Sequence, residues 1–193
     1  MVLTLNSNFK INHDNVIFSL QKAGGISVYW FELLRRFTPA HNVANYELPN
    51  SNIFGSQLLG ETELESRIPL PILRYFPFTL RVGRCSIFHS SYYRVSIQRK
   101  VANITTVHDF TYEYFSSGFT KTIHTMQKNF AVKHSAGIVC VSENTKRDLL
   151  KFIPDIDSTR IKVIYNGVGA EFHPLGSSQS NFGFDELVQK KFV

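Results

Sequence analysis

The stretch FKINHDNVIFSLQKAGGISVYWFELLRRF, residues 9–37, decides the fold class. Its first part, residues 9–14, predicts a strand, and the loop that follows closes at Gly24-Gly25. Apolar side chains then recur with the spacing of one helix face, at Ile26, Tyr29, Trp30, Leu33, Leu34 and Phe37. Arg35 and Arg36 suit the negative end of the helix dipole. The stretch therefore predicts a strand, a glycine loop and a helix.

The same alternation continues along the chain. We predict strands over residues 85–89, 104–108, 137–141 and 160–165, and helices over residues 119–134 and 143–150, the latter capped by Ser142. Strands separated by helices imply parallel crossovers. The sequence thus predicts an α/β fold with a Rossmann-like, doubly wound, mostly parallel sheet, which we place at residues 1–173. Within it, the proline-broken residues 51–83 suggest an insertion or an exposed loop with short helices.

The end of the sequence has a different character. Residues 174–184, PLGSSQSNFGF, are rich in glycine and serine and predict a linker. A short helix over residues 185–192 and the final KKFV resemble the start of another domain. We therefore expect residues 174–193 to be an interdomain linker and the beginning of a second domain.

The composition argues against several classes of protein. With 193 residues, 43% hydrophobic and 19% charged, the chain suits a folded domain rather than a disordered one. Neither a membrane-spanning run nor a signal peptide is visible, so we expect a cytoplasmic protein. The two cysteines, Cys85 and Cys140, lie in apolar stretches without a CxxC motif, and we expect two buried thiols, no disulfide and no metal site. The net charge of +6 favours phosphate ligands, but no nucleic-acid-binding motif accompanies it.

Residues just after the strands matter most, because parallel α/β sheets bind ligands there. Gly24-Gly25 precedes a helix N-terminus, where backbone N–H groups and the helix dipole favour an anion. The pair could cradle a phosphate, or it could be only a turn. GxGxxG is not present, which argues against a nicotinamide-dependent dehydrogenase.

His108-Asp109 follows the apolar strand ITTV. The imidazole could polarise a sugar hydroxyl, and the carboxylate could hold another or fix the imidazole tautomer. Because neighbours on an extended chain point oppositely, we expect only one of the two to face a ligand. A lone histidine after a strand is also commonly structural.

Other polar and aromatic residues follow the predicted strands. In FHSSYYR, residues 88–94, Ser90, Tyr92 and Tyr93 suit a sugar face, although the tyrosines could equally be rim packing. Glu143 and Asn144 follow a buried strand and either touch a ligand or only start a helix.

Between residues 67 and 84, Arg67, Arg74, Arg81 and Arg84 have no acidic residue among them. This segment suits either an anionic membrane surface or a solvated edge.

Taken together, IFSLQKAGGISVYWFELLRRF, FHSSYYR, ITTVHDFTYEYF, GIVCVSENTKRDLLKF and VIYNGVGAEFHP resemble, in order and spacing, the N-terminal domain of family 4 glycosyltransferases with the GT-B fold. The resemblance covers approximately residues 9–174 and is closest to members that build polysaccharide or lipopolysaccharide.

The resemblance implies a retaining transfer of a sugar, most commonly a hexose, from a nucleotide-sugar donor to a glycan or lipid-linked acceptor, without a catalytic metal or other cofactor. It implies that Gly24 and Gly25 approach the donor diphosphate, and that His108 contacts the reacting sugar, with Asp109 and Glu143 as weaker matches. A non-catalytic module that binds a glycan or a membrane at its surface is the alternative. In family members an Arg often stands where this sequence has Val28, and the second, donor-binding domain is not found in these residues, so we expect the chain alone to transfer sugar poorly.

Overall fold

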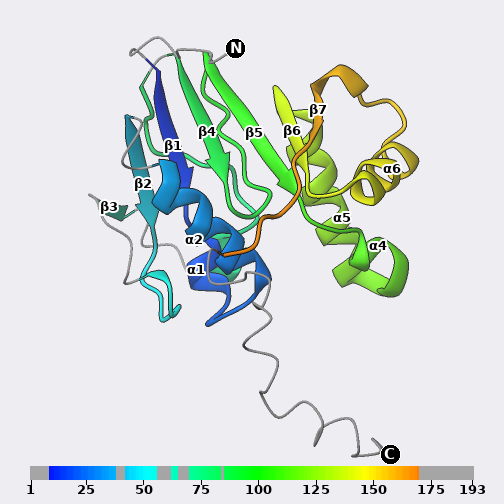
Figure 1. Cartoon of the computed structure of the whole chain (residues 1–193), viewed down its shortest axis with the longest axis horizontal. Coiled ribbons are helices and arrows are strands. Elements are labelled where there is room, and N and C mark those ends of the chain that lie inside the picture. Colours follow the sequence, from blue (N-terminus) through cyan, green and yellow to red (C-terminus); the bar gives the residue numbers. More distant parts are fainter. Residues whose placement is uncertain (1–8, 38–41, 56–61, 65–69, 84, 170–193) are drawn as a thin grey trace, which may run out of the picture.

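The computed structural model describes residues 9–37, 42–55, 62–64, 70–83 and 85–169 (Figure 1). Its centre is a seven-stranded sheet in the order β3-β2-β1-β4-β5-β6-β7. Every neighbouring pair of these strands is parallel, which confirms the predicted α/β class and the parallel sheet. The strands are β1 (Lys10–Asp14), β2 (Val43–Glu47), β3 (Thr62–Leu64), β4 (Ser86–Ser90), β5 (Val101–Val107), β6 (Gly137–Cys140) and β7 (Ile161–Val163).

Helices connect the strands. They are α1 (Ile17–Leu20), α2 (Gly25–Phe37), α3 (Leu70–Leu73), α4 (Thr111–Phe115), α5 (Gly118–Lys133) and α6 (Glu143–Phe152), and a 3-10 turn covers Ser158–Arg160. The predicted cap of α6 is confirmed, because the Ser142 side chain accepts a hydrogen bond from the Thr145 backbone N–H. In Figure 1, α2 lies in front of the sheet, and α5 and α6 lie on the side of β6 and β7.

The two faces of the sheet have separate cores because side chains alternate along each strand. On one face Trp30 of α2 packs edge-on against His13 and His89, and its indole N–H donates to Asn15 Oδ1 over 2.7 Å. On the other face Phe78 packs against Phe88, the neighbour of His89. Burial of each such aromatic ring contributes roughly 1.5–3 kcal/mol. The doubly wound prediction therefore agrees with the packing.

Several expectations need correction. Cys85 is exposed rather than buried, because β4 begins only at Ser86 and Cys85 lies before it with a φ of 56°. The irregular segment 51–83 contains the expected short helix, α3, but it also supplies β3 at the edge of the sheet. Cys140 is buried as expected, and burial raises the pKa of its thiol to about 11.

Some predictions fall on residues outside the described ranges. These are the linker at residues 174–184, the helix at residues 185–192, and the side chains of Arg67 and Arg84. Among the helices that are described, none is long and apolar enough to cross a membrane.

Candidate active site at the carboxyl ends of the strands

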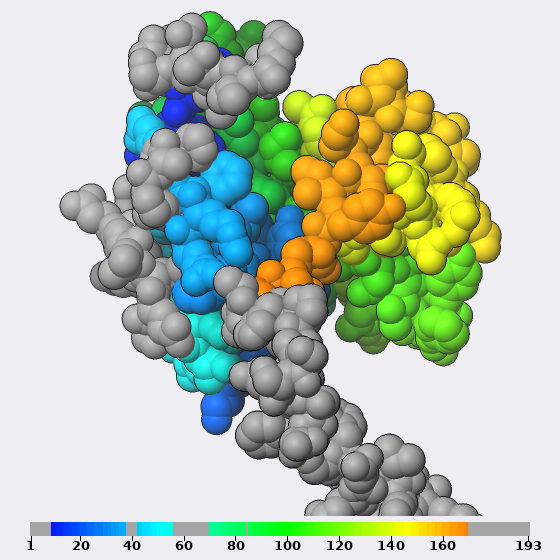
Figure 2. Space-filling model, viewed as in Figure 1, coloured from blue at the N-terminus to red at the C-terminus, as the bar shows by residue number. Residues whose placement is uncertain are grey.

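A cavity of about 280 Å³ lies beside the carboxyl ends of the central strands. It is formed by α1 and the residue after it, the start of α2, the residue that follows α3, the loops that follow β4 and β5, and side chains from α4 and α5. The lining residues are Ile17, Leu20, Gln21, Ile26, Arg74, Tyr92, Tyr93, His108, Asp109, Tyr112 and His124. In Figure 2 the surface is hollowed between the segment that follows β7 and the green surface of α4 and α5. This is the position at which open α/β sheets bind ligands.

His108 stands at the first position after β5. Its ring packs edge-on against the ring of Tyr29 from α2, with 4.9 Å between centroids and 85° between planes. Burial lowers the pKa of the imidazole to about 4, an effect that the neighbouring Asp109 carboxylate only partly opposes. His108 is therefore neutral near pH 7 and can both donate and accept a hydrogen bond.

Asp109 also lines the cavity, so both residues of the pair border it. The reason is that β5 ends at Val107, and the strict alternation of a strand no longer applies. The Asp109 carboxylate accepts a hydrogen bond of 2.9 Å from the backbone N–H of Thr111, and its backbone carbonyl accepts one of 2.8 Å from Lys128. These contacts fix the turn that joins β5 to α4.

A buried ion pair supports this turn from below. Lys128 of α5 donates to Glu113 Oε2 over 2.9 Å, and both side chains are almost fully buried. The ammonium also lies 4.3 Å from the ring centroid of Phe110. Burial lowers the pKa of Lys128, while the hydrogen bond to Glu113 opposes that change.

Gly24 and Gly25 lie at the N-terminus of α2, next to the lining residues Gln21 and Ile26. A Cβ added to Gly25 would meet nothing within 4 Å, and one on Gly24 would lie 2.4 Å from the end of the Gln21 side chain. Gly118 is the glycine with a positive φ among the described residues, so neither Gly24 nor Gly25 is required by a left-handed turn. Free space beside Gly25 agrees with an approaching ligand.

The three predicted residues at the end of β4 and just after it separate into two groups. Tyr92 and Tyr93 line the cavity, and Tyr93 has a φ of 45°, a region that bulky residues rarely occupy. Ser90 is buried beneath them and donates to Asp14 Oδ2 over 2.8 Å. The same carboxylate forms a buried ion pair of 3.2 Å with Arg94. Ser90 therefore helps to hold an internal network.

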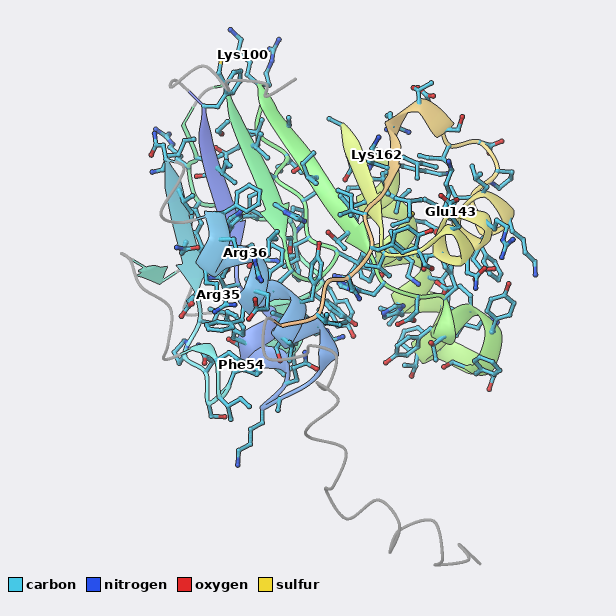
Figure 3. All side chains as sticks on the ribbon, viewed as in Figure 1. Arg35, Arg36, Phe54, Lys100, Glu143 and Lys162 are labelled. Atoms are coloured by element: carbon cyan, nitrogen blue, oxygen red, sulfur yellow. The ribbon has the colours of Figure 1, made fainter. Side chains whose placement is uncertain are left out.

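Glu143 and Asn144 are exposed in the first turn of α6. Figure 3 shows Glu143 on the α6 side of the molecule, far from Arg35 and Arg36 at the end of α2. Neither residue lines the cavity. The cavity instead brings in Arg74, Tyr112 and His124, which sequence reasoning did not connect with it. No sequence motif marks these residues, and only the tertiary fold brings residues 74 and 124 together. In the part of the chain that the structure describes, no three His, Cys, Asp or Glu side chains gather as a metal site requires.

A parallel α/β sheet with a polar and aromatic cavity at its carboxyl edge, beside a glycine-led helix, defines a Rossmann-like ligand-binding domain. The profile of Glycosyltransferase Family 4 matches residues 23–172, and the chain belongs to this family. A search of curated protein sequences found no match.

Proposed function

We propose that this domain forms the acceptor side of a retaining glycosyltransferase, which transfers a sugar from a nucleotide-sugar donor to a hydroxyl of a glycan or lipid-linked acceptor. The family match supports glycosyl transfer in general. The observation that carries the proposal is the position of His108, which lines the cavity directly after β5.

In this proposal His108 contacts the reacting sugar. A neutral imidazole donates a hydrogen bond to a sugar hydroxyl or leaving-group oxygen without adding a full charge to the cavity. Asp109 accepts hydrogen bonds from sugar hydroxyls, and Tyr92 and Tyr93 offer aromatic faces for the apolar side of a pyranose ring. Glu143 and Asn144 contribute only if another part of the protein extends a ligand toward α6.

The donor diphosphate approaches Gly24-Gly25, where the backbone N–H groups of the first turn of α2 and the helix dipole favour negative charge. As the GT-B resemblance implies, a second domain holds most of the nucleotide, and the chemistry requires no catalytic metal. The 193-residue chain by itself then transfers sugar poorly or not at all.

Binding and transfer of nucleotide sugars test the proposal. Calorimetry with UDP- and GDP-sugars measures weak binding to the 193-residue chain, and transfer is assayed with the longest gene product that contains it. Replacing His108 by Ala in that product lowers kcat by about 100-fold or more, as for the loss of one preorganised donor. His134→Ala serves as an exposed, matched control outside the cavity. Lack of both transfer and hydrolysis with every nucleotide sugar would refute the proposal.

A second candidate is a module that binds a membrane or glycan surface without catalysis. A second cavity of about 330 Å³, lined mainly by apolar side chains, includes Phe76, Met126 and Phe130, all of them substantially exposed. The exposed Arg81 belongs to the same proline-broken segment. This candidate predicts that the protein has no transferase activity. It also predicts that anionic vesicles bind the wild type and His108→Ala equally but do not bind the double variant Phe76→Ser/Met126→Ser.

A further inference from the structure

The cavity beside His108 is bordered by buried polar atoms that have no hydrogen-bond partner among the described residues. Within the described part of the chain, Gln21 Nε2, Arg74 Nε and His124 Nδ1 are buried without a hydrogen-bond partner, and all three residues line the cavity. Leaving a buried polar group unpaired costs about 1–3 kcal/mol, and native proteins contain few such groups. Three of the six such atoms among the described residues border this one cavity, where a ligand could complete their hydrogen bonds.

Arg74 is held in place for such a ligand. Its Nη2 donates to the Tyr92 hydroxyl over 3.0 Å, and its guanidinium lies 4.9 Å and 5.0 Å from the ring centroids of Tyr75 and Tyr92. Its backbone carbonyl accepts a hydrogen bond from Gln127 of α5. No ion pair among the described residues includes Arg74, so its charge is not neutralised by a carboxylate there. Aromatic contacts orient the guanidinium and leave Nε for a ligand.

His124 stands next to this arginine. Its side chain is 8% exposed and stacks on Tyr112, with 3.9 Å between centroids and 17° between planes. Burial, reinforced by the positive charges of Lys128 and Arg74, lowers the pKa of the imidazole to about 4. The neutral ring offers one donor and one acceptor, and the Tyr112 and Tyr93 rings fix its orientation.

The hydrogen-bonding chemistry of these atoms limits the chemical class of the ligand. Gln21 Nε2 and Arg74 Nε can only donate hydrogen bonds, so the partner must present acceptors. A planar guanidinium without a carboxylate partner is well suited to carboxylate and phosphate oxygens. Asp109 also lines the cavity and would repel an anion placed beside it, which leaves the region of Arg74 and His124 for negative charge and the region of Asp109 for sugar hydroxyls.

We infer that Arg74 and His124, assisted by Gln21, form a subsite for an anionic group, a carboxylate or a phosphate, carried by the acceptor. This inference rests on the proposed function. The donor diphosphate is assigned to the N-terminus of α2, whereas Arg74 and His124 come from the segment after α3 and from α5. The subsite makes the enzyme selective for acidic acceptors, such as a uronic-acid glycan or a phosphate-linked lipid.

Binding of small anions to the 193-residue chain tests the subsite. The probes are methyl β-glucuronide, inorganic phosphate and, as the neutral counterpart, methyl β-glucoside, followed by NMR signals of the His124 ring. We expect at least one anionic probe to bind more tightly than the glucoside, and Arg74→Gln to weaken it by about tenfold or more, as charged hydrogen bonds do. The exposed, matched control Arg81→Gln leaves affinity unchanged.

Vesicle binding distinguishes the two sources of the anion, a lipid phosphate and a sugar acid. Loss of binding to phosphatidylglycerol vesicles in Arg74→Gln, with weak binding of the glucuronide, assigns the subsite to a lipid phosphate. Tight glucuronide binding and vesicle binding that is independent of Arg74 assign it to a sugar acid. Circular dichroism and thermal unfolding of Arg74→Gln and His124→Gln verify that both variants fold.

Three outcomes overturn the inference. The first is that neither an anionic probe nor an anionic vesicle binds, and the second is that Arg74→Gln binds both kinds of anion as tightly as the wild type does. The third is that the neutral glucoside binds as tightly as the anionic probes. A further outcome would assign Arg74 to the donor instead of the acceptor. If Arg74→Gln weakens nucleotide sugars as strongly as the acidic probes, Arg74 serves the donor and the inference is wrong while the proposed function stands. Acidic probes that bind through Arg74 in a protein that never uses nucleotide sugars refute the proposed function alone.

Discussion

His108 and Tyr29 meet edge to face, with 4.9 Å between their ring centroids, so the histidine after β5 is held by the helix that begins at Gly25. The Tyr29 hydroxyl lies 3.5 Å from Thr106 Oγ1, and Thr106 in turn contacts His89 Nε2 over 3.0 Å. The glycine loop, the histidine and the sheet are therefore parts of one packed unit. A ligand at Gly25 that shifts α2 would therefore also move the His108 ring.

This contact predicts a difference between two substitutions of Tyr29. Tyr29→Phe keeps the ring against His108 and should retain most transferase activity, because the hydroxyl contact at 3.5 Å is weak. Tyr29→Ala removes the support and should lower kcat by about tenfold to 100-fold through misplacement of the imidazole. Steady-state kinetics on the longest gene product measures both. Equal loss in the two variants would show that the hydroxyl, and not the ring, is the important group.

Gly25→Ala separates folding from ligand binding. Gly25 has open space around its Cβ position and starts α2, so alanine should leave the free energy of unfolding unchanged or raise it by about 0.4–1 kcal/mol. The same methyl group should obstruct a diphosphate at the helix N-terminus and weaken binding of UDP or GDP, measured by calorimetry. Gly118→Ala is the converse control, since its φ of 70° should make alanine destabilising without affecting the nucleotide. Undiminished nucleotide affinity in Gly25→Ala would remove the glycine pair from the donor site.

The buried pair of Lys128 and Glu113 predicts strong non-additivity. Lys128→Met leaves the Glu113 carboxylate buried without its partner and should lower the free energy of unfolding by about 3–5 kcal/mol. Adding Glu113→Gln removes the orphaned charge and should restore a large part of that loss. Urea unfolding of both single variants and the double variant measures the coupling. Simple additivity would mean that the two charges stabilise the turn independently.

Stability should depend on pH through the buried histidines. Burial lowers the pKa to about 4 for His13, about 3 for His89, about 4 for His108 and about 4 for His124. Between pH 6.5 and these values the unfolded chain binds more protons than the folded one, so the free energy of unfolding falls as the pH falls. The slope is at most about 1.4 kcal/mol per pH unit for each histidine.

Urea unfolding at pH 7, 6 and 5 measures this dependence. Well above pH 6.5 the histidines are neutral in both states, and the curve should level off with respect to them. His13→Gln should reduce the slope below pH 6.5, because one of the contributing groups is gone. An unchanged stability from pH 7 to pH 5 would contradict the lowered values.

The fold was largely predictable because long elements leave periodic patterns. The apolar stripe from Ile26 to Phe37 and the strand before His108 both appear where expected. Short elements have no such pattern: β3 has three residues, α4 has five, and β2 (VANYE) contains few residues typical of strands. Their existence depends on neighbours in the sheet and on the Lys128–Glu113 pair rather than on local sequence.

The candidate site was predictable only in part. His108, Asp109, Tyr92 and Tyr93 follow strands, and the rule that ligands bind after parallel strands places them at the cavity. Arg74 and His124 come from a short helix's end and a helix interior, where no rule marks a binding residue. Ser90 shows the opposite case. The sequence predicts it at the site, but it is the last residue of β4 and its hydroxyl donates to the buried Asp14 carboxylate.

The exposed position of Cys85 has a practical consequence. Its backbone N–H bonds to the carbonyl of Lys100, which Figure 3 shows at the end of the sheet opposite the arrowheads of the strands. The other cysteine, Cys140, is buried and its thiol has a raised pKa, so maleimide chemistry should attach to Cys85 alone. A chain immobilised or labelled through this thiol would present its candidate cavity to solution in a single orientation, without an engineered cysteine.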